Sequence, residues 1–295
     1  MTGPGRYAPS PTGELHLGNL RTALLAWLSA RSGRAGFLLR VEDLDSGRSR
    51  EEWVDVQTAE LERLGIDWDG EPVHQSERHG LYEEAIAELR HQDLIYECFC
   101  TRAEIRQAAS APHGDLPEGA YPGTCARLSA AELSERRAAG RPPALRVRAG
   151  AARIGFSDLV CGETEGRVDD FVVRRNDGDF GYNLAVTIDD ADQGIGEVVR
   201  GGDLLDSTPR QLWLLDRLGL ERPGCYAHVP LMLAPDGSRL AKRHGAVTLE
   251  QRVEAGQTVP EVVGELAASV GLLPPGQSCL AGDLLDRFDW ESLRC

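Results

Sequence analysis

The sequence predicts an α/β fold built on a doubly wound parallel sheet. Short apolar runs alternate with segments whose apolar residues recur at helical spacing, and this alternation occupies two separate stretches of the 295-residue chain. Between them, from about Cys98 to Gly181, the alternation is lost. We therefore expect an inserted segment between two halves of one sheet.

The first half of the predicted sheet begins with the short strand GRYAPS, which ends in a Pro/Gly loop. From Leu17 the apolar residues fall on one helical face, and Gly33 ends that helix. The run FLLRVED, residues 37–43, is continuous and apolar, as in a buried parallel strand. Helices over about 50–64 and 77–91 follow, and then the strand-like run LIYECFC.

The second half begins near residue 182, where the alternation returns with YNLAVTIDD and EVVRGGDL. A helix over TPRQLWLLDRLGL and a strand near YAHVPLML follow, and the tail after Arg243 is mostly helical. The inserted segment contains the short strands ALRVR and FVVRR. We expect four parts: sheet halves at 1–97 and 182–245, an insertion at 98–181, and a short helical region at 246–295.

Composition limits the classes of function. The net charge of −15 argues against broad, nonspecific binding of nucleic acid, although a local basic face remains compatible with it. No apolar run has the length of a membrane span, and the N-terminus lacks the pattern of a signal peptide. We expect a cytoplasmic protein with no membrane partner and, because nothing indicates an obligate dimer, a monomer.

The stretch RYAPSPTGELHLGN places a histidine and a glycine at the start of an otherwise apolar helix. A strand that ends in a Pro/Gly loop and leads into a helix directs backbone N–H groups toward an anion. His16 and Asn19 bracket this turn, and Gly18 leaves room for a base or a ribose. The pattern indicates a nucleotide site; the alternative is a tight turn with a polar capping residue.

Lys242 is the single lysine among the 32 lysine and arginine residues. This composition suggests that arginine has replaced lysine wherever any cation suffices, so this position requires the slender ammonium. In the loop RLAKRHGA, that ammonium is suited to stabilise charge that develops on the α-phosphate of ATP under attack. The alternative is an exposed basic loop.

These motifs resemble a known family. HLGN and LAKR are similar to the two signature motifs of class I aminoacyl-tRNA synthetases, and RYAPSPTGELHLGNLRTAL resembles the glutamyl branch. RVEDLD, YNLAVTIDDADQGIGEVVRG, STPRQ and AKRHGAVTLEQ match the same branch in the same order, over roughly residues 5–255. The resemblance implies that the sheet is a Rossmann-like, nucleotide-binding catalytic domain that uses ATP with Mg²⁺.

The resemblance also implies a pocket for glutamate. Arg6, assisted by Arg200, is expected to bind the side-chain carboxylate, and Glu42 to bind the ammonium group. The rest of the family's amino-acid pocket falls at positions that match Ala8, Ser10 and Tyr182. The alternative for Arg6 and Glu42 is a structural ion pair.

The inserted segment carries a candidate metal site. Cys98 and Cys100 flank one residue, and Tyr121 precedes Cys125 by four positions. Three thiols and one further donor suit a structural, tetrahedral Zn²⁺. Full-length glutamyl enzymes that carry zinc commonly end this motif with Cys-x-His, but Arg127 stands at that histidine here. A tyrosine before the last cysteine resembles the pattern of a shorter relative, which implies Tyr121 as the fourth ligand. Three reduced thiols without metal are the alternative, and the other candidate donors are His113 and Asp115.

The resemblance favours the shortened relatives within the branch. Full-length members read tRNA with a large C-terminal anticodon-binding domain, whereas the catalytic half here ends near Gly256, so we expect no such domain. Gly202 and Leu205 replace an acid and a histidine that are usual in full-length members. The shortened relatives attach glutamate to the modified base queuosine at the wobble position of tRNA(Asp), so the expected partner is an anticodon stem-loop that carries queuosine.

The expected reaction has two steps. Glutamate attacks the α-phosphate of Mg-ATP without any need for tRNA, and a queuosine hydroxyl then displaces AMP from the glutamyl-adenylate. His16, Asn19 and Lys242 are the expected catalytic residues, and Gly18 is expected at the ATP. Two alternatives remain open. The chain could charge another acceptor, such as a small amine or a carrier protein, or it could be a silent paralogue that binds RNA or protein.

Overall fold

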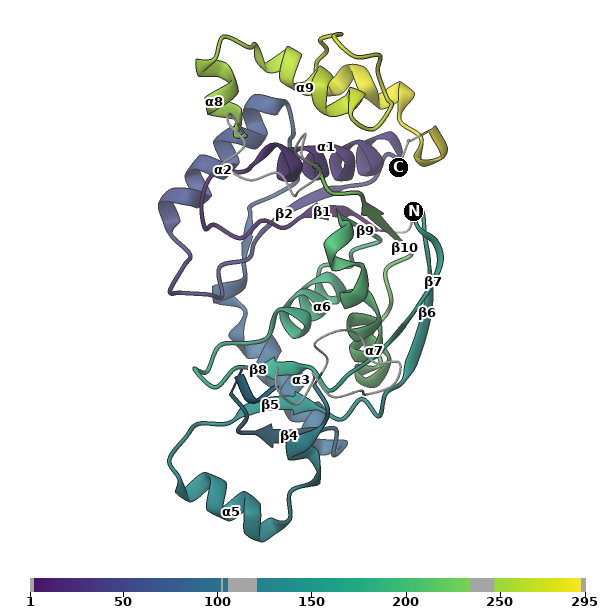
Figure 1. Cartoon of the computed structure of the whole chain (residues 1–295). Coiled ribbons are helices and arrows are strands. Elements are labelled where there is room, and N and C mark those ends of the chain that lie inside the picture. The colour runs from purple at the N-terminus through teal and green to yellow at the C-terminus, as the bar shows by residue number, and fades with distance from the viewer. Residues whose placement is uncertain (1–2, 102, 106–120, 234–246, 293–295) are drawn as a thin grey trace.

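The computed structural model describes residues 3–101, 103–105, 121–233 and 247–292 (Figure 1). A seven-stranded sheet with the order β3-β2-β1-β9-β10-β6-β7 forms its centre. Neighbouring strands pair in parallel, except the β6–β7 hairpin. The strands are β1 (Gly5–Tyr7), β2 (Phe37–Val41), β3 (Val73–His74), β6 (Arg153–Asp158), β7 (Gly162–Arg167), β9 (Glu197–Gly201) and β10 (Cys225–Val229). The predicted α/β fold is confirmed.

Helices cover both faces of the sheet. On one face lie α1 (Leu17–Ser32), α2 (Glu51–Leu64) and α9 (Val259–Ala268), and on the other lie α6 (Tyr182–Asp192) and α7 (Thr208–Leu218) (Figure 1). Alternate residues of β9 separate the two cores, since Val199 packs into the α1 core and Val198 packs with Leu212 and Leu215 of α7. The sheet is therefore doubly wound, and the run YNLAVTIDD forms the helix α6.

The strand order reverses at β1. From β1 the chain continues to β2 on one side, whereas β9, on the other side, follows much later in the sequence. Connections that leave the carboxyl ends of β1 and β9 diverge at such a switch point, and the crevice between them is where open α/β sheets bind ligands. The fold thus places the loop that follows β1 at the expected position of a site.

The predicted insertion contributes to two sheets. Antiparallel strands β4 (Ile95–Cys98), β5 (Ala144–Val147) and β8 (Val172–Arg174) form a separate three-stranded sheet, with α5 (Ala130–Ala138) beyond it (Figure 1). The β6–β7 hairpin also falls within residues 98–181, yet it extends the central sheet through β10. Short amphipathic strands do not specify which sheet they join, so the boundaries of the four parts remain predictions.

The segment after residue 246 packs on α1 (Figure 1). It contains α8 (Leu249–Glu254), α9 and short 3₁₀ turns at Ala281–Arg287 and Trp290–Ser292. Trp290 donates its indole N–H to Ser29 of α1 at 2.9 Å, which connects this segment to the helix that covers the central sheet. The remaining long helix of the central region is α3 (His79–His91). Within the residues that the structure describes, no helix is both long enough and apolar enough to cross a bilayer.

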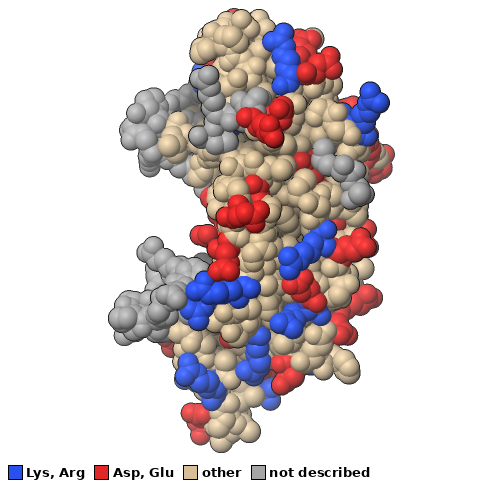
Figure 2. Space-filling model, turned by 90° about the vertical axis from the view of Figure 1, so that its right-hand side faces the viewer, with Lys and Arg blue, Asp and Glu red and all other residues tan. Residues whose placement is uncertain are grey.

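Charged side chains of both signs share the molecular surface. On the face in Figure 2, Lys and Arg side chains are most frequent in the lower half, at the height of the three-stranded sheet, and Asp and Glu lie among them. The net charge of −15 is therefore not spread as a uniformly acidic surface.

Candidate active site

A cavity of about 590 Å³ opens beside the carboxyl ends of β1, β2 and β9. This volume lies in the range of small-molecule sites. Lys242 lies outside the described residues. The described segments before and after Lys242 both reach this region. Met232, in the segment before it, lines the cavity, and the carbonyl of Val247, in the segment after it, accepts the first backbone N–H of α1 at 2.7 Å. The cavity wall includes the other residues that sequence predicted for ATP and glutamate: Arg6, Ala8, Ser10, His16, Gly18, Asn19, Glu42, Tyr182 and Arg200.

The HLGN turn forms the N-terminus of α1. His16 is the N-cap, and its Nδ1 accepts the backbone N–H of Asn19 at 3.2 Å. A side chain at Gly18 would place its Cβ 3.1 Å from the His16 ring, which is tighter than ordinary packing. The structure therefore contains the polar helix cap that the sequence offered as the alternative to a nucleotide site. Since capping uses Nδ1, a role toward ATP falls to Nε2, beside the positive end of the helix dipole.

Two residues of α2 that the sequence analysis missed hold the loop after β1. Gln57 donates its amide to the carbonyls of Ser10 at 3.1 Å and Gly13 at 2.7 Å. Glu60 accepts the N–H of Leu15 at 2.9 Å, and burial raises the pKa of its carboxyl to about 7. Their spacing on the buried face of α2 was the available signal, because polar residues at buried helical positions need partners.

Arg6 of β1 is buried and paired with a carboxylate. Its Nε and Nη2 donate to Asp190 of α6 at 3.0 and 3.2 Å, and its Nη1 donates to the carbonyl of Val199 at 3.3 Å. Burial disfavours the ionised form of Asp190, but Arg6 and Arg40 outweigh it and lower the pKa of this carboxyl to about 2. Arg6 thus has a structural ion pair while it lines the cavity. The sequence signal for Asp190 was an acidic pair within an apolar helix.

Glu42 follows β2 and belongs to the same network. Its Oε1 lies 3.4 Å from Nη2 of Arg40, whose Nη1 is 2.7 Å from Asp190. Burial raises the pKa of Glu42, and the guanidinium groups of Arg40 and Arg6 oppose the rise. A carboxyl held in this balance at a cavity wall would gain from a cation, because an ammonium group favours its ionised form.

Arg200 of β9 has different surroundings. Its Nε donates to Nε2 of His228 at 3.0 Å and its Nη2 donates to the hydroxyl of Thr208 at 2.8 Å. Its Nη1 is buried and has no hydrogen-bond partner within the described part of the chain. Leaving a buried charged donor unpaired is costly, so a bound carboxylate at this wall would satisfy a need that the protein leaves open.

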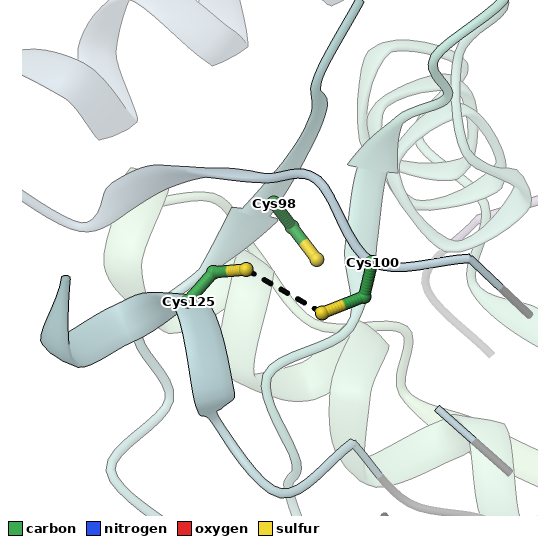
Figure 3. A group of neighbouring side chains, drawn as sticks. All are labelled: Cys98, Cys100 and Cys125. Carbon is green, nitrogen blue, oxygen red and sulfur yellow. Dashed lines mark hydrogen bonds between the residues drawn. The ribbon is translucent and has the colours of Figure 1, made fainter. Parts of the chain in front are cut away.

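The three predicted cysteine ligands meet in the inserted segment. Their Sγ atoms all lie within 4.8 Å of one another, and Cys100 and Cys125 are 3.5 Å apart (Figure 3). The hydroxyl of Tyr121 lies 3.4 Å from both Cys98 and Cys100 and accepts the N–H of Cys125 at 2.8 Å. These four residues, called the cysteine cluster below, bring three thiols and a phenol to one point. His113 and Asp115 lie outside the described residues.

The donor set fits a tetrahedral zinc ion. Sulfurs bound to one Zn²⁺ at about 2.3 Å would lie roughly 3.8 Å apart, close to the separation of Cys100 and Cys125. Burial raises the pKa of the Cys100 thiol to about 12, so the thiol is neutral unless a cation favours the thiolate. The cluster therefore has suitable ligands at suitable distances.

Comparison with known proteins defines the class. Residues 4–282 match the family model for class I tRNA synthetases (E and Q), catalytic domain, so the chain belongs to this family. A crystal structure of a glutamate tRNA ligase from Elizabethkingia meningosepticum, in complex with its amino acid, superposes with a TM-score of 0.83 and 26% identity. It is matched over 100% of this chain, which spans only 66% of the ligase's length.

The curated relatives define the group within this class. The glutamyl-Q tRNA(Asp) synthetase of Nocardia farcinica is 58% identical over 95% of this chain and 88% of its own length. That of Symbiobacterium thermophilum is 48% identical over 97% of this chain and 92% of its own length. The chain belongs to the glutamyl-Q tRNA(Asp) synthetases and is therefore a ligase. Enzymes of its class use ATP with Mg²⁺.

Proposed function

We propose that this chain activates glutamate with ATP in the absence of tRNA, and that it transfers the glutamyl group to queuosine at the wobble position of tRNA(Asp). The observation that carries the proposal is the cavity at the switch point, whose wall joins two buried arginines, a carboxyl and the N-terminus of α1. The names of the relatives support the acceptor.

Glutamate has two carboxylates and one ammonium group, and the cavity offers a counterpart for each kind of charge. Arg200, with its unpaired Nη1, and Arg6 bind the side-chain carboxylate. Glu42 binds the ammonium, whose positive charge favours the ionised form of this buried carboxyl. The remaining wall of the amino-acid pocket comes from Ala8, Ser10 and Tyr182.

ATP occupies the part of the cavity beside the N-terminus of α1. His16 and Asn19 stabilise the charge that develops on the α-phosphate as the glutamate α-carboxylate attacks, Gly18 gives the nucleotide room, and Lys242 neutralises the same charge. The new bond joins carboxylate oxygen to phosphorus, and pyrophosphate leaves. A queuosine hydroxyl then attacks the glutamyl carbonyl and AMP leaves. Positioning and charge carry most of this catalysis.

The cysteine cluster holds one structural Zn²⁺ in this proposal, with Cys98, Cys100, Cys125 and Tyr121 as ligands. A zinc ion would stabilise the inserted segment by joining the end of β4 to the turn around Cys125. The reaction itself takes place in the separate cavity of the central sheet and uses no group of the cluster.

Exchange of labelled pyrophosphate into ATP tests the first step. Glutamate is expected to support exchange without any RNA, and glutamine or aspartate to support far less. Activity that appears only when tRNA is added would refute tRNA-independent activation, and complete inactivity under both conditions would favour a silent paralogue.

Transfer of labelled glutamate tests the acceptor. Label is expected on tRNA(Asp) that carries queuosine and not on tRNA(Asp) with guanosine at the wobble position. Removal of the 3′ adenosine separates the two kinds of acceptor, since label lost with that nucleotide would identify an ordinary charging enzyme.

Lys242→Arg probes the single lysine of the chain. The planar guanidinium cannot replace a compact ammonium at a developing phosphate charge, so we expect glutamate-dependent exchange to fall at least about tenfold at unchanged thermal stability. Arg243→Lys, at the neighbouring position, serves as the matched control. Exchange by Lys242→Arg at the wild-type rate would contradict the assigned role.

A further inference from the structure

One hydrogen-bond partner of Arg200 is a buried histidine. His228 of β10 is 1% exposed and lies between Arg200 and Asp158, which ends β6. Its Nδ1 is 2.6 Å from Asp158 Oδ2, and its Nε2 accepts from Arg200 at 3.0 Å. Asp158 is in turn fixed by the N–H groups of Val160 and Cys161, each at 2.9 Å. A continuous chain of hydrogen bonds therefore runs from the β6–β7 turn to the cavity wall.

The geometry determines the protonation of the ring. Arginine has only donors, so Nε2 of His228 must accept and the single ring proton resides on Nδ1, directed at Asp158. Burial lowers the pKa of His228, and although Asp158 opposes this effect, the imidazole stays neutral. The pKa of Asp158 is lowered to about 2, because its hydrogen bonds with His228 and the turn outweigh the cost of burial, so it stays ionised.

We propose that His228, held by Asp158, is a positioning residue that aims Arg200 and thereby gives the cavity its preference for a carboxylate side chain over a carboxamide. This inference rests on the proposed function, in which Arg200 binds the side chain of glutamate. Because Nε donates to His228 and one N–H of Nη2 donates to Thr208, the guanidinium is held in one orientation, and Nη1 is its nitrogen without a partner in the described part of the chain.

A fixed donor discriminates between the two amino acids. The carboxylate of glutamate accepts at either oxygen, whereas the amide of glutamine presents one acceptor and an N–H₂ group that meets a donor. A freely moving guanidinium could turn away from that N–H₂ group. Since Arg6 lines the same cavity, a fixed Arg200 puts donors near both terminal atoms of the bound side chain, so the N–H₂ group of glutamine faces a donor in either orientation of the amide. A buried polar group that is left unpaired in this way produces strong discrimination. The β6–β7 hairpin supplies Asp158 to this chain of hydrogen bonds from its place beside β10 in the central sheet.

Two amide variants separate the hydrogen bond at Nδ1 of the imidazole from those at Nε2, where the Thr208 hydroxyl also lies at 3.0 Å. The asparagine amide in His228→Asn reaches the Nδ1 position and can still donate to Asp158, but nothing replaces the acceptor for Arg200. The glutamine amide in His228→Gln places its oxygen near the Nε2 position and can still accept from Arg200. Both variants remove the ring and lose similar packing, so they form a matched pair. His91→Asn at the exposed end of α3 is the control for the substitution itself.

Pyrophosphate exchange on each variant measures KM for glutamate, KM for ATP, kcat and the ratio of glutamate to glutamine activity. We expect His228→Asn to raise KM for glutamate at least about tenfold and to lower the glutamate preference by a similar factor. KM for ATP is expected to stay constant. His228→Gln is expected to keep KM for glutamate within about threefold of the wild type.

Equal KM values for glutamate in the two variants would overturn the proposal, as would a parallel loss of ATP and glutamate binding, because both results indicate a role in packing alone.

If His228→Asn does not fold, Asp158→Asn carries the test: we expect a rise of about threefold in KM for glutamate alone, and an unchanged value overturns the proposal. A wild-type chain without glutamate-dependent exchange refutes the proposed function and this inference together. Wild-type exchange with unaffected variants refutes only the inference.

Discussion

The cavity and the cysteine cluster balance charge in opposite ways. Beside the cavity, Arg6 and Arg40 both pair with Asp190, so the protein itself compensates these buried charges. In the cysteine cluster, burial raises the pKa of the Cys100 thiol and of the Tyr121 phenol, so these two donors become charged only when a cation arrives. A site whose charges are paired is formed before its ligand binds, whereas we expect the cysteine cluster to depend on the proposed metal for its stability.

The largest expected effect comes from breaking the charge balance of the cavity. Asp190→Asn leaves the guanidinium groups of Arg6 and Arg40 without their shared carboxylate. Removing one partner of a buried ion pair costs about 3–5 kcal/mol, so we expect a loss of unfolding free energy of that size at pH 7. Urea unfolding at several pH values provides the measurement.

The pH dependence of the unfolding free energy tests whether the ionised carboxylate of Asp190 causes this loss of stability. The pKa of Asp190 is lowered to about 2 in the folded protein from 3.8, so its stabilising effect is complete above pH 3.8 and is lost as the pH falls through about 2. The difference between wild type and Asp190→Asn should shrink over that range. Asp216→Asn, which breaks an exposed pair with Arg222, is the control and should cost less than about 1 kcal/mol. An equally small cost at Asp190 would remove the contrast between the two sites.

The next effect concerns the metal dependence of the cysteine cluster. Tyr121→Phe removes only the hydroxyl that lies 3.4 Å from two of the sulfurs. If that oxygen is the fourth ligand, zinc affinity should fall at least about tenfold, as measured by competition with a chromogenic chelator. Glutamate-dependent exchange should persist, since the cavity contains no group of the cluster.

Tyr96→Phe is the matched control for the cluster. The Tyr96 hydroxyl donates to Asp170 at 2.8 Å, so its loss should lower stability without changing the affinity for zinc. Unchanged zinc affinity in Tyr121→Phe would transfer the fourth ligand to another donor, with His113 and Asp115 as the candidates.

The smallest expected effect concerns the hydrogen bond between Thr208 and Arg200 at the cavity wall. Thr208→Val keeps the shape of the side chain and removes the hydroxyl that accepts from Arg200 at 2.8 Å. Because His228 still holds the other side of the guanidinium, we expect KM for glutamate to rise only about threefold. Thr187→Val is the control, since that hydroxyl donates to Asn183 within α6 at 2.6 Å. A change of similar size in Thr187→Val would show that KM follows general stability.

The sequence predicts the cysteine cluster more completely than it predicts the cavity. The cysteine cluster was predictable because its cysteines lie close in the chain, at most 27 positions apart. In the cavity, the residue types and the loop after β1 were predictable, but their partners were not. Arg6 is paired with Asp190, 184 positions away, and no spacing rule connects those two residues.

By itself, the sequence determined the alternating elements, the polar turn at His16, and the donor set of the cysteine cluster. These features depend on short-range periodicity, backbone freedom and ligand chemistry. Only the tertiary structure decided that Asp190 compensates Arg6, that His228 fixes Arg200, and that the β6–β7 hairpin joins the central sheet. Such pairings follow from strand order and register, which the packing of the whole sheet selects.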